Sequence, residues 1–295
     1  MLTGLLLLVV TALLWVMQGS VVSNAAEKKL NISFIQMMMG LVVMICILPL
    51  KFFVEIAVNP VTVIALIFAG IFNCLAFKLL NKAMQIGPNG LTWAIAQSAF
   101  AVPFLMGIFF FKVPCSVIRG TGLALLIISM VLMGLSGKND NNIKGSKSKW
   151  IFFSLLAYVV IGLSQCGGNL PSYFIEDSVA DIYNLLFRSA LVATGFFIGA
   201  LANVLAFDRG NFTAKGTVKE IIVLIFSTVM ASVCMFCALD MLVKKSAGAI
   251  GYPIVTGLSI VFFMIYTAFT LKERPTWQSI GSVFICLAGI AALMF

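Results

Sequence analysis

Long apolar segments follow one another along this chain, separated by short polar stretches. A helix that crosses the roughly 30 Å hydrocarbon core of a bilayer needs about 20 apolar residues. A lipid-facing backbone must satisfy its own hydrogen bonds, and these segments do not alternate in polarity, so helices are expected rather than barrel strands. The sequence predicts an all-α integral membrane protein with ten transmembrane helices, at residues 2–22, 32–51, 60–81, 89–111, 117–136, 150–172, 182–206, 218–240, 248–271 and 277–295.

The composition also indicates that the chain is surrounded largely by lipid. Of the 295 residues, 62% are hydrophobic and 10% are charged, whereas a soluble domain carries roughly 25% charged residues. The chain is therefore expected to be embedded in a lipid bilayer. Its net charge of +9 comes from Lys and Arg placed between the apolar segments, which fits membrane topology and anionic headgroups better than nucleic acid.

Little in the sequence supports metal or covalent chemistry. The chain has no His, the commonest general base and metal ligand. Most of the seven Cys lie inside apolar segments, where they pack as small hydrophobes. Cys234 and Cys237 have CxxC spacing without a second pair, so we expect no cofactor and no metal. Residues 2–22 lack a basic n-region and are too long for an h-region, so we expect a transmembrane helix rather than a signal peptide.

The chain contains an internal repeat. Shifted by 161 positions, the stretch from Ala83 to Ser98 matches the stretch from Lys244 to Ser259. Earlier helices match at an offset of 147, which pairs Gln18 with Gln165. We predict a first five-helix repeat at 1–137, a polar basic linker at 138–149 and a second five-helix repeat at 150–295. An odd number of helices per repeat gives the two repeats opposite orientations, as in many secondary transporters.

The positive charges are distributed unevenly between the loops. Thirteen of the 19 Lys and Arg residues lie in or beside the first, third, fifth, seventh and ninth loops, and five lie in the other loops. The positive-inside rule then places the linker in the cytoplasm and both termini outside.

The last two predicted helices resemble a known family. The stretches Gly251-Tyr-Pro-Ile-Val-Thr-Gly-Leu-Ser-Ile, Leu271-Lys-Glu-Arg-Pro-Thr-Trp-Gln-Ser-Ile-Gly-Ser and Ala288-Gly-Ile resemble the EamA-type repeat of the drug/metabolite transporter superfamily. In that family a short acidic turn separates helices 9 and 10. The first repeat departs from the pattern, because Phe111-Lys-Val-Pro-Cys-Ser carries no acid at the matching turn. The resemblance implies two inverted five-helix repeats and a transporter of the bacterial inner membrane, as a monomer or homodimer. Some relatives keep both termini in the cytoplasm, opposite to the charge count.

Polar residues inside the predicted spans are the candidate substrate-binding residues, because an unpaired polar group is costly in hydrocarbon. Trp15 and Gln18 share a face of the first helix, and Gln165 and Asn169 share a face of the sixth. An inverted pseudo-two-fold axis would bring Gln18 and Gln165 to one central cavity, although hydrogen bonding between helices is the alternative. The complete set is Trp15, Gln18, Asn73, Trp93, Gln97, Gln165, Asn169, Arg188 and Tyr252.

Trp93 and Arg188 also carry open alternatives. Trp93 and Gln97 have apolar repeat partners, which suits a role in specificity, but Trp93 could instead belong to an interfacial belt. Arg188 lies about 10 Å deeper than Asp181. It could bind a carboxylate or phosphate, or its side chain could extend back to the interface near Asp181.

Helix ends and prolines give further expectations. Lys78 and Asp240 are near repeat equivalents close to helix ends, where interfacial anchoring competes with a gating role. Pro103 and Pro253 are expected to break helices 4 and 9, at hinges beside the substrate site.

The leading hypothesis is a secondary transporter that moves a small polar metabolite, such as a sugar, amino acid or nucleoside, by alternating access. Its cavity would be lined by helices 1, 3, 4, 6, 8 and 9. One alternative is proton-coupled export of cationic drugs or amines, which the absence of an acid in helix 1 disfavours. A second alternative, a membrane-embedded enzyme, lacks any HExxH or GxSxG motif.

Overall fold

The computed structural model describes residues 2–56, 59–111, 116–136, 145–173, 181–206, 214–244, 251–273 and 276–294. Within these ranges the chain is helical and has no strand. The α-helices are α1 (Leu2–Glu27), α2 (Ile32–Ile47), α3 (Pro60–Ile86), α4 (Asn89–Gln97), α5 (Ala101–Phe111), α6 (Val117–Ser136), α7 (Lys147–Tyr173), α8 (Ile182–Ala206), α9 (Thr217–Val243), α10 (Gly251–Thr270) and α11 (Trp277–Met294). Two 3-10 turns, η1 (Leu48–Phe52) and η2 (Ser98–Phe100), complete the described elements.

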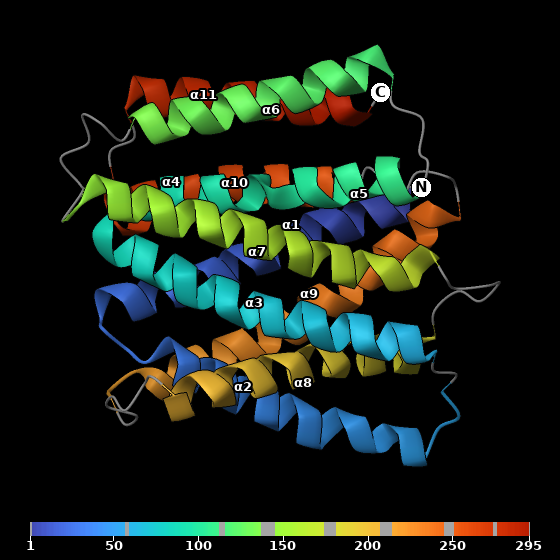
Figure 1. Ribbon diagram of the computed structural model, residues 1–295. Coiled ribbons are helices and arrows are strands. Elements are labelled where there is room, and N and C mark those ends of the chain that lie inside the picture. Colours follow the sequence, from blue (N-terminus) through green and yellow to red (C-terminus); the bar gives the residue numbers. More distant parts are fainter. Residues whose placement is uncertain are drawn as a thin grey trace.

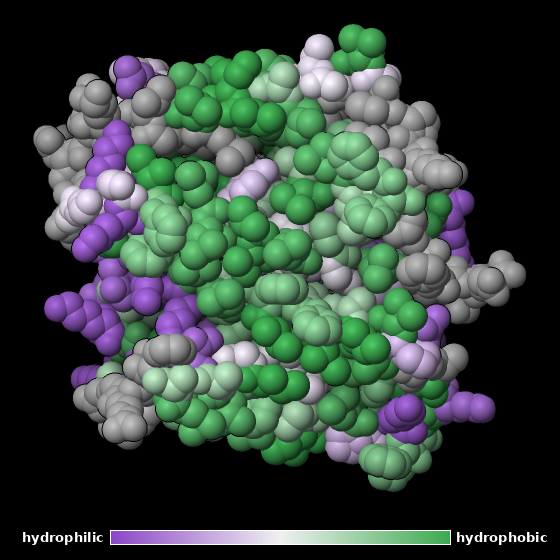
Figure 2. Space-filling view, viewed as in Figure 1, coloured by the Kyte–Doolittle hydropathy of each residue, from purple (hydrophilic) through white to green (hydrophobic). Residues whose placement is uncertain are grey.

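The described helices have the length and hydropathy of membrane spans. Seven of them are long and apolar enough to cross a bilayer, namely α1, α2 with η1, α3, α7, α8, α9 and α10, while α6 and α11 contain shorter apolar stretches. On the face shown in Figure 2, a broad apolar band runs between two polar rims. The protein is an α-helical, multi-pass membrane protein.

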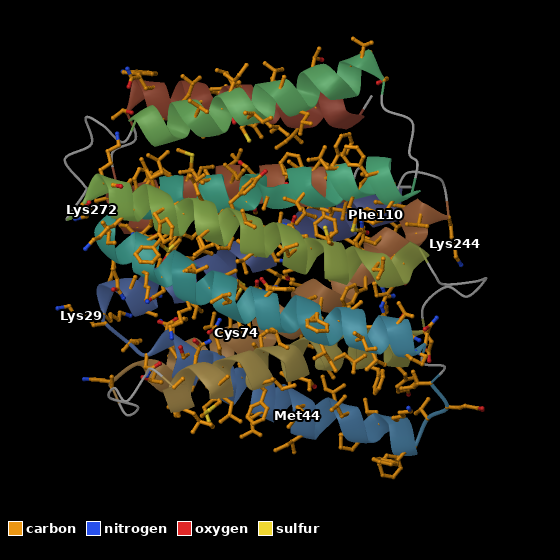
Figure 3. The ribbon with its side chains drawn as sticks, in the orientation of Figure 1. Lys29, Met44, Cys74, Phe110, Lys244 and Lys272 are labelled. Carbon is orange, nitrogen blue, oxygen red and sulfur yellow. The ribbon has the colours of Figure 1, made fainter. Side chains whose placement is uncertain are left out.

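The helices lie side by side in one bundle, with α6 and α11 at one edge and α2 and α8 toward the other (Figure 1). Successive helices run back and forth across the bundle, so the loops and the chain ends lie on two opposite sides of it (Figure 1). We call the side that holds both chain ends the termini side. We call the opposite side, where α6 ends and α7 begins, the linker side. Lys29 and Lys272 lie on the linker side and Lys244 on the termini side (Figure 3).

The most extensive helix contacts join the two halves of the chain. Helix α3 packs against α7 and α8, α1 against α9, α2 against α8, and α6 against α11. Helices α3 and α8 approach closely at two glycines, because a Cβ atom on Gly70 would meet the Val192 carbonyl oxygen and one on Gly195 would meet that of Ile67. The halves are therefore interleaved and do not form separate lobes.

The helix predicted at 89–111 is divided in the structure. Helix α4 ends at Gln97, the 3-10 turn η2 follows, and α5 begins at Ala101. Pro103 has no N–H, and a proline ring clashes with the carbonyl of the residue four positions earlier, here Ala99 in η2. The break therefore lies one turn before the proline.

Pro253 does not divide its helix in the same way. It is the third residue of α10, which begins at Gly251 within the described residues. An N–H in the first turn of a helix has no intrahelical partner, so its loss costs no bond there. Among residues 251–270 the structure therefore places no break at Pro253, contrary to the prediction. The predicted start at 248, most of the 138–149 linker and the turn at 112–115 lie outside the described residues.

Candidate functional site

A cavity lies in the middle of the bundle, between the two rims. It is lined by seven helices: α1, α3, α4, α7, α8, α9 and α10. The expected lining of helices 1, 3, 4, 6, 8 and 9 is thus extended by α8, through Val192 and Phe196. The volume is about 90 Å³, whereas ligand pockets commonly hold roughly 300–1,000 Å³. The cavity therefore has to widen before it can hold a metabolite.

Carboxamide side chains enter the cavity from four helices. Gln18 (α1), Asn73 (α3), Gln97 (α4) and Gln165 (α7) all line it. The Gln18 Nε2 donates to Thr228 Oγ1 at 3.5 Å. The Oε1 atoms of Gln97 and Gln165 are buried and have no hydrogen-bond partner within the described ranges. Unmet polar groups of this kind can bind a hydroxyl or amide of a ligand, because leaving them unpaired is costly.

Aromatic rings supply much of the remaining wall. Trp15 and Tyr252 face the cavity with ring centroids 6.4 Å apart. Phe77 and Phe196 meet edge to face at 5.7 Å on another part of the wall. None of the described residues that line the cavity is Asp, Glu, Lys or Arg. The lining therefore combines aromatic faces with neutral hydrogen-bonding groups, which suits a small polar solute.

Six of the nine predicted binding residues meet in this cavity: Trp15, Gln18, Asn73, Gln97, Gln165 and Tyr252. Gln18 and Gln165, the two residues that the sequence offset pairs, are both among them. The other three, Trp93, Asn169 and Arg188, are not part of the lining.

Trp93 lies behind the wall on the linker-side part of α4. Its ring is buried and packs against Phe263 with centroids 4.9 Å apart. Gly19 makes room for both rings, since a Cβ there would come within 2.7 Å of Phe263 and 3.1 Å of Trp93. The position is interior, so the alternative of an interfacial belt is wrong for Trp93.

Arg188 lies at the termini side of the cavity, in a buried cluster with Asp240 and Ser172. Its Nη1 donates to Asp240 Oδ2 at 2.7 Å and its Nη2 donates to Ser172 Oγ at 3.1 Å. The guanidinium also stacks over the Phe236 ring, 4.4 Å from the centroid. Arg188 is only 2% exposed, so the alternative of a side chain that extends back to the interface near Asp181 is wrong.

The Arg188 cluster, as we call Ser172, Arg188 and Asp240, lies one helical turn beyond the cavity wall. Each member is four residues from a lining residue: Gly168 on α7, Val192 on α8 and Phe236 on α9. Residues four apart share a helix face. The cluster is thus the next polar layer toward the termini side, and Phe236 separates it from the cavity.

On the linker side, carboxylates of the second half of the chain contact the first half. The Glu273 carboxylate accepts hydrogen bonds from the backbone N–H groups of Asn89 at 2.7 Å and Gly90 at 3.0 Å. These are the first residues of α4, whose N-terminus favours an anion. The preceding residue, Lys272, has a φ of 55°, which turns the chain just before Glu273.

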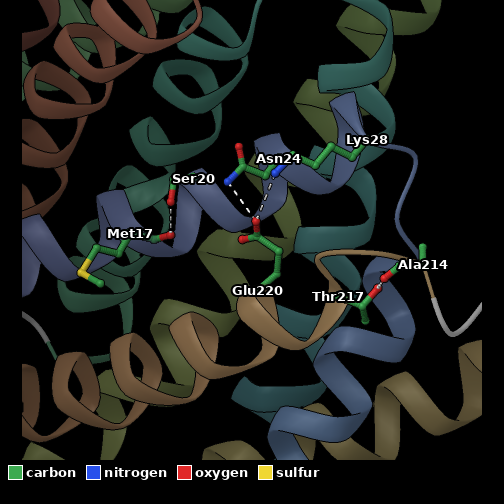
Figure 4. A network of polar contacts seen from close by, with 7 residues as sticks. All are labelled: Met17, Ser20, Asn24, Lys28, Ala214, Thr217 and Glu220. Atoms are coloured by element: carbon green, nitrogen blue, oxygen red, sulfur yellow. Dashed lines mark hydrogen bonds and ion pairs between the residues drawn. The ribbon is translucent and has the colours of Figure 1, made fainter.

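A second carboxylate, Glu220 of α9, meets the end of α1 (Figure 4). Asn24 Nδ2 donates to Glu220 Oε1 at 3.2 Å, and the Lys28 ammonium lies 3.7 Å from the same oxygen. Glu220 is 2% exposed whereas Lys28 is 52% exposed.

Sequence reasoning missed the roles of these acids. The sequence predicts an anchor or gate for Asp240 near a helix end, whereas the structure buries Asp240 against Arg188. Its near repeat equivalent, Lys78, instead donates to Asn203 at 3.0 Å. Glu273 was noted only as part of an acidic turn. A usable signal for it was the Gly-Pro-Asn-Gly start of α4, whose free N–H groups need an acceptor.

Comparison with protein-family models and with curated proteins finds no match for this chain. A solved crystal structure of a protein does share the arrangement. Its TM-score is 0.60 over 97% of this chain and 94% of that chain, at 10% sequence identity. At that identity the likeness shows the fold alone.

Proposed function

We propose that this chain is a secondary transporter that moves a small polar metabolite by alternating access through the central cavity. The observation that carries the proposal is that cavity itself, in the middle of a membrane-spanning bundle. Amides from both halves line it, including the repeat equivalents Gln18 and Gln165. Transporter sites commonly lie near the bilayer midplane at the interface of two repeats.

The proposal includes ten transmembrane helices in two inverted five-helix repeats, of the EamA type in the drug/metabolite transporter superfamily. Under the proposed duplication the first span corresponds to the sixth and the third to the eighth. The contact of α3 with α7 then corresponds to that of α9 with α1, and both are extensive. The Gly-rich starts of α4 and α10 also lie on opposite sides of the bundle, as inversion requires. Location in a bacterial inner membrane belongs to the same proposal.

The described cavity favours a polar solute over a cationic drug. A carboxylate is the natural partner of both a proton and a cation in a membrane, and none lies in the described lining.

A ligand screen tests the proposal. Purified protein is heated with sugars, amino acids, nucleosides or amines, and the hit is then assayed for uptake into proteoliposomes. A ligand at a hundred times its Kd stabilises the folded state by about 2.7 kcal/mol, so one class should raise Tm by several degrees. Gln18→Ala and Gln165→Ala should each lose most of that shift and of the uptake.

Gln278→Ala serves as the control, because Gln278 is exposed on α11. It should keep both the Tm shift and the uptake. If no class shifts Tm and none accumulates in proteoliposomes, the transporter proposal fails.

A further inference from the structure

The Arg188 cluster is a pair of opposite charges with unused hydrogen-bonding capacity. Arg188 and Asp240 are joined by one ion-pair contact of 2.7 Å, with side chains 3% and 5% exposed. Arg188 Nε and Asp240 Oδ1 are buried and have no partner among the described residues. One donor on the cation and one acceptor on the anion of this ion pair are thus left open.

The same neighbourhood holds further unpartnered polar atoms. Asn169 Oδ1 and Gln165 Oε1 lie on α7, within two turns of Ser172, and neither has a partner in the part of the chain that the structure describes. Unpartnered polar atoms thus occur at Gln165 and Asn169, between the cavity and the charges. Phe236 is the apolar side chain in the way, since it both lines the cavity and supports the guanidinium.

The stability of the fold does not by itself require the buried ion pair of Arg188 and Asp240. A buried ion pair costs desolvation of both groups, and well-packed apolar residues of similar volume are often equally stable. The cluster also joins three helices of one half, α7, α8 and α9, so it does not fasten the two halves together as Glu220 and Glu273 do.

We propose that Arg188 and Asp240 form a subsite for a zwitterion, a small substrate that carries both a carboxylate and an ammonium group. This rests on the proposed transport function and names its substrate class. The carboxylate accepts from Arg188, the ammonium donates to Asp240, and the rest of the molecule meets the amides of the cavity. Displacement of the Phe236 ring joins the subsite to the cavity and adds the room that 90 Å³ does not provide.

Charge balance selects for the zwitterion. A ligand with only a carboxylate would draw Arg188 away from Asp240 and leave a buried anion unpaired. A ligand with only an ammonium group would leave Arg188 unpaired. An uncompensated buried charge is strongly unfavourable, whereas a zwitterion keeps both side chains paired.

The experiment uses matched ligands on the wild-type protein. L-serine is compared with its methyl ester, which keeps only the cation, with glycerate, which keeps only the anion, and with glycerol, which has neither. Glycine, L-alanine and L-leucine extend the zwitterion series in size, each with its ester and hydroxy acid. At least one zwitterion should raise Tm by several degrees and enter proteoliposomes, while its ester and hydroxy acid bind at least tenfold more weakly.

The double variant Arg188→Gln with Asp240→Asn removes both charges together and so leaves no unpaired partner. It should bind the zwitterion at least tenfold more weakly while unchanged elution on size exclusion shows that it is folded. Because the wild-type ligand series decides the matter by itself, a variant that fails to fold does not rescue the proposal.

Three results overturn the subsite, and they differ in what else they remove. If glycerol or a sugar shifts Tm through Gln18 and Gln165 while every zwitterion is inert, the subsite is wrong and transport stands. If a zwitterion binds but its ester or hydroxy acid binds equally well, Arg188 and Asp240 do not select the ligand by its two charges. A flat response to all ligands removes both proposals.

Discussion

Carboxylates have different partners on the two sides of this bundle, and two of the three, Glu220 and Asp240, are buried. On the linker side, Glu220 and Glu273 each reach from the second half of the chain to the first, to the end of α1 and the start of α4. On the termini side, Asp240 bonds to Arg188, which lies in the same half. The first two contacts hold the halves together. The third lies beside the cavity with bonding capacity unused.

This difference indicates which contacts must break when the two halves of the chain move apart on each side of the bundle. A motion that separates α4 or the end of α1 from the second half must break the linker-side contacts. The same motion need not disturb Arg188 and Asp240. We therefore expect the linker side to open when the hydrogen bonds of Glu220 and Glu273 break. We expect the ion pair of Arg188 and Asp240 to rearrange when a ligand binds.

The largest effect is expected from Asp240→Ala. It leaves the Arg188 guanidinium buried without its anion, which costs about 3–5 kcal/mol. Thermal unfolding in detergent measures the loss. The double variant Arg188→Met with Asp240→Leu should recover most of the stability and none of the zwitterion binding. Equal losses in the single and double variants would show that the pair, not the orphaned charge, sets the cost.

A smaller effect is expected from Glu273→Ala. The variant removes the acceptor of two α4 N–H groups, and hydrogen bonds to a charged group contribute roughly 1.5–3 kcal/mol. Partial replacement by water should limit the net loss of stability to about 2 kcal/mol. Hydrogen exchange should speed up at residues 89–97 and stay unchanged at 182–190. Glu55→Ala removes an exposed carboxylate and controls for charge. Uniform acceleration in both regions would contradict the independence of the two sides.

The smallest effect is expected from Lys28→Ala. The ammonium is 52% exposed and 3.7 Å from Glu220, and exposed ion pairs contribute about 0–1 kcal/mol. Unfolding should shift barely more than in Lys219→Ala, a change at another exposed lysine. By contrast, Asn24→Ala should cost more, because it removes the direct hydrogen bond to buried Glu220. If Lys28→Ala cost more stability than Asn24→Ala, the ion pair rather than the hydrogen bond would be the main contact of Glu220 with α1.

The sequence predicted those features that depend on residues close together in the chain or on a constant offset between two segments. Apolar runs of span length located the helices, because only the helix satisfies the backbone in lipid. The repeat offset paired Gln18 with Gln165, and both side chains line the one cavity. Pro103 indicated a break, which its steric reach to Ala99 places in η2.

Pairing between distant helices escaped the same reasoning. Arg188 and Asp240 are 52 positions apart, and nothing in either helix specifies the rotation that brings them together. Trp93 looked like a site residue by its spacing from Gln97, yet the rotation of α4 turns it toward Phe263. Depth and rotation about the helix axis are set by packing, for example at Gly70 and Gly195, and periodicity alone does not report them.

The 3-10 turn after Gln97 has a mechanical consequence. Helix α4 has nine residues, so it is a lever about 13 Å long at 1.5 Å per residue, with η2 as its pivot. A tilt of about 10° moves its far end by roughly 2 Å, enough to separate the Asn89 and Gly90 N–H groups from Glu273. Gln97, at the pivot, hardly moves. A tilt of this short helix would therefore break the linker-side contacts while the Gln97 amide keeps its place in the cavity lining.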